Sequence, residues 1–161
     1  VALRNAITFG VSNLKELGAE EKIRIFTESR RTQDYLYKSL LNDGYEEVLE
    51  FNGSNSDEKS IRIYNEWCSK PENENSKNVN MRQAIIDYFK DKGRILIATE
   101  AGAEGLNIQF CSMIINYDLP WNPQLVEQRI GRCHRFGQKY DVTVINFLSS
   151  TNVVEQIIYQ L

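Results

Sequence analysis

The sequence contains few of the residues that build metal sites and disulfide frameworks. Its 161 residues include one histidine, His134, and three widely spaced cysteines, Cys68, Cys111 and Cys133. An odd number of cysteines without a Cys-x-x-Cys pair argues against a disulfide scaffold and against a zinc site. Cysteines used in this way indicate a reducing compartment. We therefore expect a cytoplasmic protein that holds no metal through these residues.

Long apolar runs and a strong net charge are also absent. No stretch approaches the roughly 18 apolar residues of a membrane span, and no signal peptide opens the chain. The chain begins at Val1 rather than at methionine, which suggests a segment excised from a longer protein. Because the formal net charge is −3, binding to nucleic acid would require a local basic patch. One cluster stands out, formed by Arg129, Arg132, Arg135 and Lys139.

The sequence further lacks the two motifs with which many hydrolases hold ATP and magnesium. There is no Gly-x-x-x-x-Gly-Lys-Ser/Thr loop to cradle phosphate groups. No Asp-Glu pair follows an apolar strand, where it would hold Mg²⁺. A complete ATP site is therefore not expected within this chain.

What the sequence does contain is a regular alternation of short apolar runs and helical patterns. We expect strands at residues 23–26, 48–51, 95–98, 113–115 and 142–148, and helices at 32–41, 56–67, 81–90, 123–136 and 152–160. Uninterrupted apolar strands are buried on both faces, and strands that alternate with helices form parallel βαβ units. The predicted fold class is α/β, a single three-layer sandwich with a mainly parallel sheet.

The domain layout follows from the same patterns. Residues 1–20 are expected to be a lead-in or linker helix and residues 21–161 one domain, with an exposed loop at 70–80. Ser56 is the expected N-cap of the third helix. Functional loops in parallel α/β folds lie at the carboxyl ends of strands, which places 27–30, 99–107 and 118–122 along one edge.

One candidate loop follows a buried strand at residues 98–107. Gly102 and Gly105 permit positive φ and a close approach of the backbone to a ligand, and exposed N–H groups there can meet a phosphate. A tight turn from strand to helix explains the same glycines without any ligand. The loop alone therefore leaves both interpretations open.

The second candidate is the helix that contains Gln128, Arg132 and Arg135. These residues share one stripe, at positions i, i+4 and i+7, while Val126, Ile130 and Cys133 form an apolar stripe on another side. The two arginines have no carboxylate three or four residues away, and guanidinium groups favour phosphate. Gly131 inside the helix indicates that something must come close there. A solvated basic face is the alternative explanation.

The two stretches together resemble a known family. Residues 98–109, Ala-Thr-Glu-Ala-Gly-Ala-Glu-Gly-Leu-Asn-Ile-Gln, resemble motif V of superfamily-two helicases. Residues 128–138, Gln-Arg-Ile-Gly-Arg-Cys-His-Arg-Phe-Gly-Gln, resemble motif VI, and residues 25–29 resemble motif IV. With the segment at 116–123, Asn-Tyr-Asp-Leu-Pro-Trp-Asn-Pro, the chain is similar to the C-terminal RecA-like lobe of Swi/Snf-type ATPases. Within this group, the sequence resembles most the bacterial branch that includes the RNA-polymerase-associated recycling factor.

The resemblance implies a role for each matched residue. Arg132 and Arg135 resemble arginine fingers, and Gln128 resembles the motif VI residue near the γ-phosphate. Gly105 and Asn107 resemble positions close to the nucleotide. Thr99, and more weakly Ser29, resemble contacts to the nucleic-acid backbone. For Ser29, a role as N-cap of the helix that follows is an equal alternative.

The resemblance also implies cofactors and partners. ATP and Mg²⁺ would be held mainly by an N-terminal RecA-like lobe of the same polypeptide. The polymer would be nucleic acid, with duplex DNA preferred on family grounds, and no membrane is involved. The implied activity is ATP hydrolysis by a helicase or translocase, with the isolated lobe inactive. A degenerate lobe used for docking or regulation, a lobe of an RNA helicase, and a self-sufficient nucleotide-binding enzyme are the alternatives.

Several other side chains receive structural assignments. Trp121 is expected to pack under the start of the helix at 123–136, and a wedge at a lobe interface or stacking on a base are the alternatives. Tyr117 and Phe136 are expected in the core or at an interface. Glu46, Glu47 and Glu50 are expected to form a solvated acidic patch.

Overall fold

The structure is a computed structural model that describes residues 1–70, 77–103, 108–131, 133 and 140–148. The chain divides into two compact units. Unit 1 comprises Val1–Glu28 and Gly105–Leu161, and unit 2 comprises Ser29–Glu104. Each unit is described separately below.

The centre of unit 1 is a set of three parallel strands, β1 (Ile23–Thr27), β4 (Met113–Asn116) and β5 (Thr143–Asn146). Strand β4 pairs in parallel with both others, with Ile25 opposite Ile115 and Ile115 opposite Ile145. Every residue of β1 and β4 is buried. The uninterrupted apolar runs therefore belong to strands covered on both faces, as the sequence predicts.

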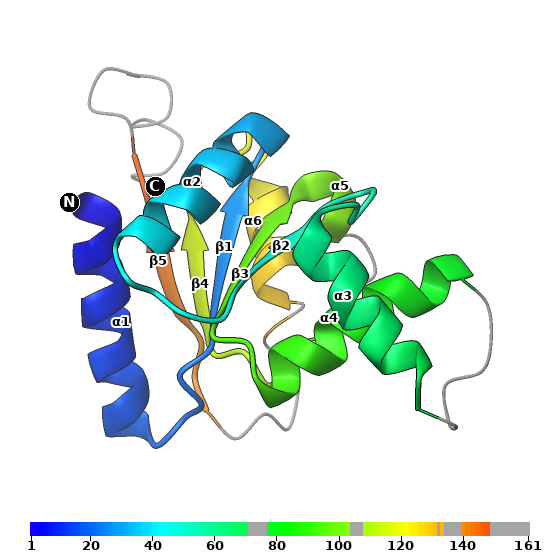
Figure 1. Ribbon diagram of the computed structural model, residues 1–161. Helices are drawn as coiled ribbons and strands as arrows, with labels where there is room; N and C mark the ends of the chain where they lie inside the picture. Colours follow the sequence, from blue (N-terminus) through cyan, green and yellow to red (C-terminus); the bar gives the residue numbers. More distant parts are fainter. Residues whose placement is uncertain (71–76, 104–107, 132, 134–139, 149–161) are drawn as a thin grey trace. The chain divides into compact units, whose positions relative to one another are not determined.

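Two helices, α1 (Ala2–Leu17) and α6 (Pro123–Gly131), cover opposite faces of these strands (Figure 1). Helix α1 buries Ile7, Gly10 and Leu14 and packs against β4 and β5. Gly10 faces the side chain of Met113, and α1 ends at Gly18, whose φ of 68° is in the left-handed region that favours glycine. The helix expected within residues 1–20 thus forms and contributes apolar side chains to the core of unit 1.

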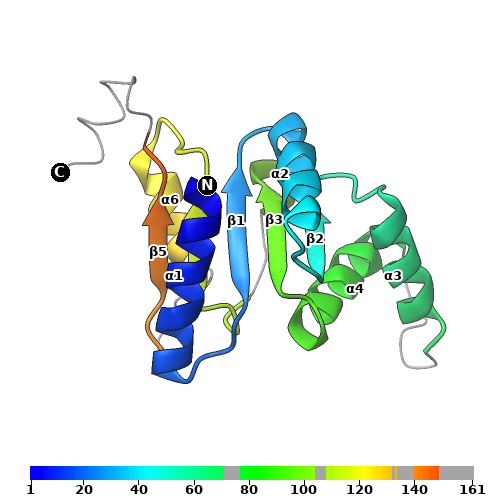
Figure 2. The same ribbon diagram turned by 60° about the vertical axis from the view of Figure 1, so that its left-hand side comes forward.

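Unit 2 contains two parallel strands, β2 (Val48–Phe51) and β3 (Ile95–Thr99), which align Val48 with Ile95. Its helices are α2 (Arg30–Asn42), α3 (Glu58–Cys68), α4 (Lys77–Asp91) and the single turn α5 (Glu100–Ala103). Helix α2 packs against both strands, and α3 and α4 pack against each other and against β2. Figure 2 shows α3 and α4 side by side at the end of this unit.

Several expected boundaries need correction. Helix α3 is capped by Asp57, whose carboxylate accepts the Ser60 N–H at 2.8 Å, and Ser56 lies outside it. A carboxylate at the N-cap also complements the helix dipole, which favours Asp57 over the neighbouring serine. Residues 77–80, expected in an exposed loop, are helical. Strand β5 is shorter than expected, and the helix expected at 152–160 lies outside the described residues.

The predicted fold class is confirmed. Both units are built from parallel strands with helices packed on them: β4 pairs in parallel with β1 and β5, and β2 pairs in parallel with β3. In the described part of the chain, no helix is long and apolar enough to span a membrane. Cys68, Cys111 and Cys133 are free thiols.

Candidate functional sites

In unit 1, the carboxyl ends of β1 and β4 are joined by a short polar contact. The Thr27 hydroxyl donates to Oδ2 of Asp118 at 2.6 Å, and the Glu28 N–H donates to the same oxygen at 3.1 Å. Asp118 follows β4 by two residues and its side chain is partly exposed. These polar groups lie where ligands bind in parallel α/β folds, at the strand ends.

Helix α6 begins immediately after this edge. Asn122 accepts the N–H of Gln124 at 3.0 Å, and Pro123 occupies the first helical position, where its missing N–H costs no hydrogen bond. Val126 and Cys133 are buried and Ile130 is half-buried, so the predicted apolar stripe faces the strands. Gln128 is exposed. The helix therefore presents Gln128 to solvent while its apolar side is covered.

Arg129 does not belong to an exposed basic cluster, which corrects the sequence interpretation. It is only 2% exposed, and its Nη1 donates to Asn116 Oδ1 at 2.9 Å and to the Asp118 carbonyl at 3.2 Å. Its guanidinium also lies 4.5 Å from the centre of the Phe26 ring. Residue type alone cannot distinguish a buried arginine from a solvated one, because both occur in charged helices.

Trp121 corrects a second expectation. Its side chain is 77% exposed, so it does not pack under the start of α6 among the described residues. Tyr117, by contrast, is half-buried with its ring 5.7 Å from that of Phe147. An indole in water at the strand-end edge offers an apolar face with one polar N–H group, which suits contacts with a partner molecule.

In unit 2, Ser29 and Thr99 hold different positions. Ser29 is the N-cap of α2, where its hydroxyl accepts the Thr32 N–H at 3.0 Å, in agreement with the capping alternative. Its side chain is nevertheless exposed. Thr99 is the last residue of β3 and is 4% exposed. Capping uses one lone pair of a serine hydroxyl, which leaves further hydrogen-bonding capacity.

Gly102 is required for packing rather than for positive φ. A Cβ atom at this position would lie 2.7 Å from the Phe51 carbonyl oxygen and 2.8 Å from Cα of Asn52. Arg82 also donates to the Gly102 carbonyl. The glycine therefore lets α5 approach the end of β2, which favours the turn explanation for this position. At Gly131, no described atom lies within 4 Å of such a Cβ.

The end of β2 carries a buried amide network that sequence reasoning missed. Gln33 Nε2 donates to the carbonyls of Phe51 at 3.2 Å and Ile97 at 2.7 Å, and Asn52 Nδ2 donates to Gln33 Oε1 at 3.1 Å. The Asn52 N–H donates to Asn55 Oδ1 at 2.8 Å, and the Asn55 N–H donates to Asn52 Oδ1 at 2.9 Å. The signal in the sequence was the turn Asn-Gly-Ser-Asn, whose asparagine side chains can bond to nearby backbone groups.

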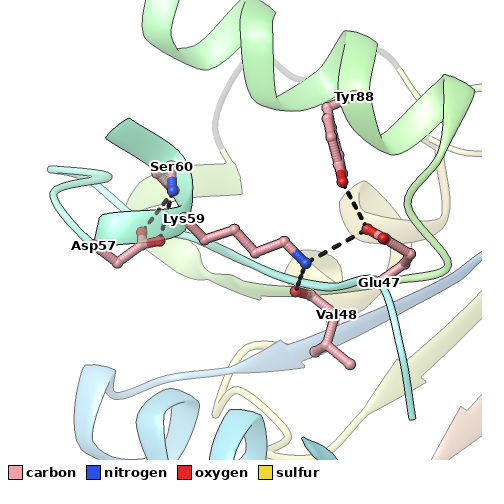
Figure 3. A network of polar contacts seen from close by, with 6 residues as sticks. All are labelled: Glu47, Val48, Asp57, Lys59, Ser60 and Tyr88. Atoms are coloured by element: carbon pink, nitrogen blue, oxygen red, sulfur yellow. Dashed lines mark hydrogen bonds and ion pairs between the residues drawn. The ribbon is translucent and has the colours of Figure 1, made fainter. Parts of the chain in front are cut away.

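A second missed network surrounds Glu47, which was expected to be solvated. Figure 3 shows the Tyr88 hydroxyl donating to Glu47 Oε2 at 2.8 Å, with Lys59 Nζ at 3.5 Å from the same oxygen and 3.1 Å from the Val48 carbonyl. Burial opposes ionisation of Glu47, but the bonds from Tyr88 and Lys59 outweigh it and lower its pKa. Burial and the adjacent carboxylate raise the pKa of Tyr88 to about 12.

Neither network offers metal or nucleophile chemistry. In the residues that the structure describes, no three His, Cys, Asp or Glu side chains gather as a metal site. Burial raises the pKa of the Cys111 thiol well above its ordinary value, which keeps it protonated and unreactive. Gly105, Asn107, Arg132 and Arg135 lie outside the described residues.

Comparison with known proteins decides the family. Residues 9–137 match the model for the helicase conserved C-terminal domain. The chain belongs to this family. It is 41% identical over 139 residues to the protein named uncharacterized ATP-dependent helicase YqhH of Bacillus subtilis (strain 168). It is 44% identical over 74 residues to RNA polymerase-associated protein RapA of Serratia proteamaculans (strain 568).

The matches cover most or part of this chain but only a small part of each relative. The YqhH match covers 86% of this chain and 21% of YqhH, and the RapA match covers 44% of this chain and 8% of RapA. The chain therefore spans only a small part of the relatives it matches. Together with the family match, these relatives confirm the resemblance to a superfamily-two, Swi/Snf-type C-terminal lobe.

Two solved structures support the fold. The C-terminal part of the Fun30 ATPase domain superposes with a TM-score of 0.68 at 24% identity, covering 98% of this chain and 44% of that one. The C-terminal domain of the DEAD-box protein Dbp5 gives a TM-score of 0.56 at 23% identity, covering 96% and 79%. The expected RecA-like α/β fold is thus confirmed.

Proposed function

We propose that this chain is the C-terminal motor lobe of an ATP-dependent DNA translocase or helicase. It would supply arginine fingers and nucleic-acid backbone contacts to an ATP site that another lobe holds. The observation that carries the proposal is the exposed Gln128 on α6, a helix whose other side is buried. The chain presents this motif VI residue outward, yet its sequence contains no phosphate-cradling loop.

The proposed chemistry is charge stabilisation during phosphoryl transfer. Arg132 and Arg135 would contact the triphosphate, where an arginine finger is worth about 10³ to 10⁵ in rate. Gln128, one helical turn before Arg132, would lie near the γ-phosphate. Gly105 and Asn107 would approach the nucleotide from the loop after β3. ATP and Mg²⁺ would be held mainly by an N-terminal RecA-like lobe of the same polypeptide.

The proposed nucleic-acid contacts come from unit 2. Ser29 has an exposed hydroxyl at the start of α2, and the adjacent N–H groups and positive end of the helix favour phosphate. Thr99 would contribute a second contact to the backbone. Contacts of this kind fix position on the polymer but read no sequence, so specificity should be low. We propose that the nucleic acid is duplex DNA and that the protein acts in the cytoplasm.

Motion follows from these contacts. Arg132 and Arg135 would bridge the two lobes while a triphosphate is present, and the bridge would be lost after hydrolysis. Backbone contacts on the two lobes would then advance along the strand in alternation. Because this lobe holds only part of the site, the isolated chain should not hydrolyse ATP above background.

The decisive experiment is Arg132→Ala in the complete protein. We expect ATP turnover to fall by about 10³-fold or more while the melting temperature stays nearly unchanged. Arg94→Ala is the matched control, because Arg94 is exposed and precedes β3. A loss of only about two- or threefold would remove Arg132 from the finger role. Full activity of the variant with intact partner binding would favour a docking module instead.

A further inference from the structure

Arg129 is a buried cation at the centre of unit 1, directly beside the exposed Gln128. Its Nη1 contacts the side chain of Asn116 at the end of β4 and the Asp118 carbonyl in the loop that follows. Its guanidinium also lies over the Phe26 ring of β1. One side chain thus joins α6 to the carboxyl ends of two strands.

The contacts extend beyond Arg129 itself. Asn116 Nδ2 donates to Asn146 Oδ1 at 2.8 Å, which adds the end of β5. Asp118 accepts bonds from Thr27 and from the Glu28 backbone at its carboxylate. The Asn116 amide therefore accepts a bond from Arg129 with its oxygen and donates one to Asn146 of β5 with its nitrogen. Rotation of this amide would break both hydrogen bonds.

This arrangement determines how α6 is rotated about its axis. The other inward residues of the helix, Val126 and Ile130, make apolar contacts, which have no directional preference. Hydrogen bonds from Arg129 to two fixed oxygens do have one. Adjacent residues on a helix point about 100° apart, so a rotation that moved Gln128 into the buried place of Arg129 would also break the bonds of Arg129 to both oxygens.

We propose that Arg129 is a positioning residue for motif VI: its buried guanidinium fixes the rotation of α6 and thereby aims Gln128, and the finger arginines that follow it, at the nucleotide. The inference rests on the proposed function of this lobe. Arg129 itself touches no phosphate, because it is enclosed by the strand ends. Displacement of a catalytic group by about 1 Å can cost on the order of 100-fold in rate.

The test uses the complete protein with Arg129→Lys and Asn116→Ala. We expect kcat to fall by about 10- to 100-fold for Arg129→Lys and less for Asn116→Ala, with KM for ATP changed by under about threefold. If Arg129→Lys does not fold, Asn116→Ala, which removes one acceptor of Arg129 without changing any charge, is used as the only test variant.

Leu14→Ala provides the control for lost stability. Leu14 is fully buried in α1, on the opposite face of the strands from α6, so its truncation should lower the melting temperature without changing kcat. Variants are assayed well below their melting temperatures. If Arg129→Lys and Asn116→Ala lower only the melting temperature, as Leu14→Ala does, the positioning role is wrong. If Arg132→Ala leaves turnover intact, the proposed function itself fails.

Discussion

The hydroxyl of Thr27 donates to the carboxylate of Asp118 across 2.6 Å, tying the end of β1 to the residues that follow β4. The two residues are 91 positions apart in the chain. A hydrogen bond to a charged acceptor contributes more than one to a neutral acceptor. Among the described residues, the Asp118 carboxylate receives only one other donor, the Glu28 N–H. The contact should therefore contribute measurably to the stability of unit 1.

Replacing Thr27 with valine tests this contact. The shape of the side chain is kept while the donor is lost, so we expect a loss of about 1–2 kcal/mol in the free energy of unfolding. Chemical denaturation of the chain measures it. Thr143→Val is the matched control, since Thr143 also lies in a strand of unit 1 and its hydroxyl makes no hydrogen bond within the described part of the chain. Equal losses in both variants would contradict the assignment.

Gly102 leads to a second prediction, because any larger residue must push backbone atoms aside. Gly102→Ala places a Cβ 2.7 Å from the Phe51 carbonyl, and we expect it to cost about 2–3 kcal/mol of stability. Gly53→Ala is the control in the same unit. A Cβ at Gly53 would lie 3.8 Å from Cβ of Ala101, an ordinary contact, so its effect should stay within about 0.5 kcal/mol.

If both alanine variants were equally stable, the close approach of α5 to β2 would be wrong. If Gly102→Ala instead kept its stability but lost ATP turnover in the complete protein, the original ligand explanation for this glycine would be favoured. Thermal unfolding and turnover measured on the same samples separate these outcomes.

The sequence predicted what periodicity controls and missed what tertiary contacts decide. The apolar runs at β1, β3 and β4 were sufficient to predict parallel, doubly covered strands, because burial on both faces leaves few alternatives. Arg129 and Trp121 were assigned to the wrong environments. An arginine can be buried when two oxygens accept its hydrogen bonds, and Trp121 is exposed although it lies next to an amphipathic helix. Neither environment is visible in the local sequence.

The candidate site divides in the same way. Motif spacing identified the helix that carries Gln128, and α6 presents this residue outward as the stripe predicts. The amide network of Gln33 and Asn52 was missed because its members are separated by 19 positions and meet only in the fold. Ser29 was correctly given a capping alternative, since serine before a helical pattern is a local signal.

Glu47 and Tyr88 yield a third prediction, testable by a double-mutant cycle. Glu47→Gln and Tyr88→Phe should show a coupling energy of about 0.5–1.5 kcal/mol at pH 7, because the phenol donates to an ionised carboxylate. The pKa of Glu47 is lowered in the folded state, so this stabilisation is present above its ordinary pKa of 4.5 and is lost as pH falls through the folded value.

Urea denaturation at pH 7 and at about pH 3.5 measures both parts of this prediction. Tyr45→Phe is the control, since Tyr45 is half-buried in the same unit and its hydroxyl has no hydrogen-bond partner among the residues that the structure describes. A coupling energy near zero at pH 7 would contradict the network in Figure 3. A coupling that grew at the lower pH would contradict the assigned charge state of Glu47.

Glu50 in β2 behaves in the opposite sense, and it gives the last prediction. Burial, followed by the nearby carboxylates of Asp57 and Asp34, raises its pKa from 4.5 to about 7. A carboxyl whose pKa is raised by folding favours the folded state below its unfolded pKa and loses that advantage as pH rises through its folded pKa. The protein should therefore lose stability between about pH 4.5 and pH 7 through this group.

Glu50→Gln removes the titrating group and keeps its shape. Its stability relative to the unsubstituted protein should increase from pH 5 to pH 8 by about 1–2 kcal/mol, less than the pKa shift alone implies because the side chain stays partly in water. Asp34→Asn should move the transition to lower pH, since one repelling carboxylate is gone. Nuclear magnetic resonance titration of the Glu50 carboxyl carbon reads its pKa directly. A value near 4.5 would contradict both the burial of Glu50 and its acidic surroundings.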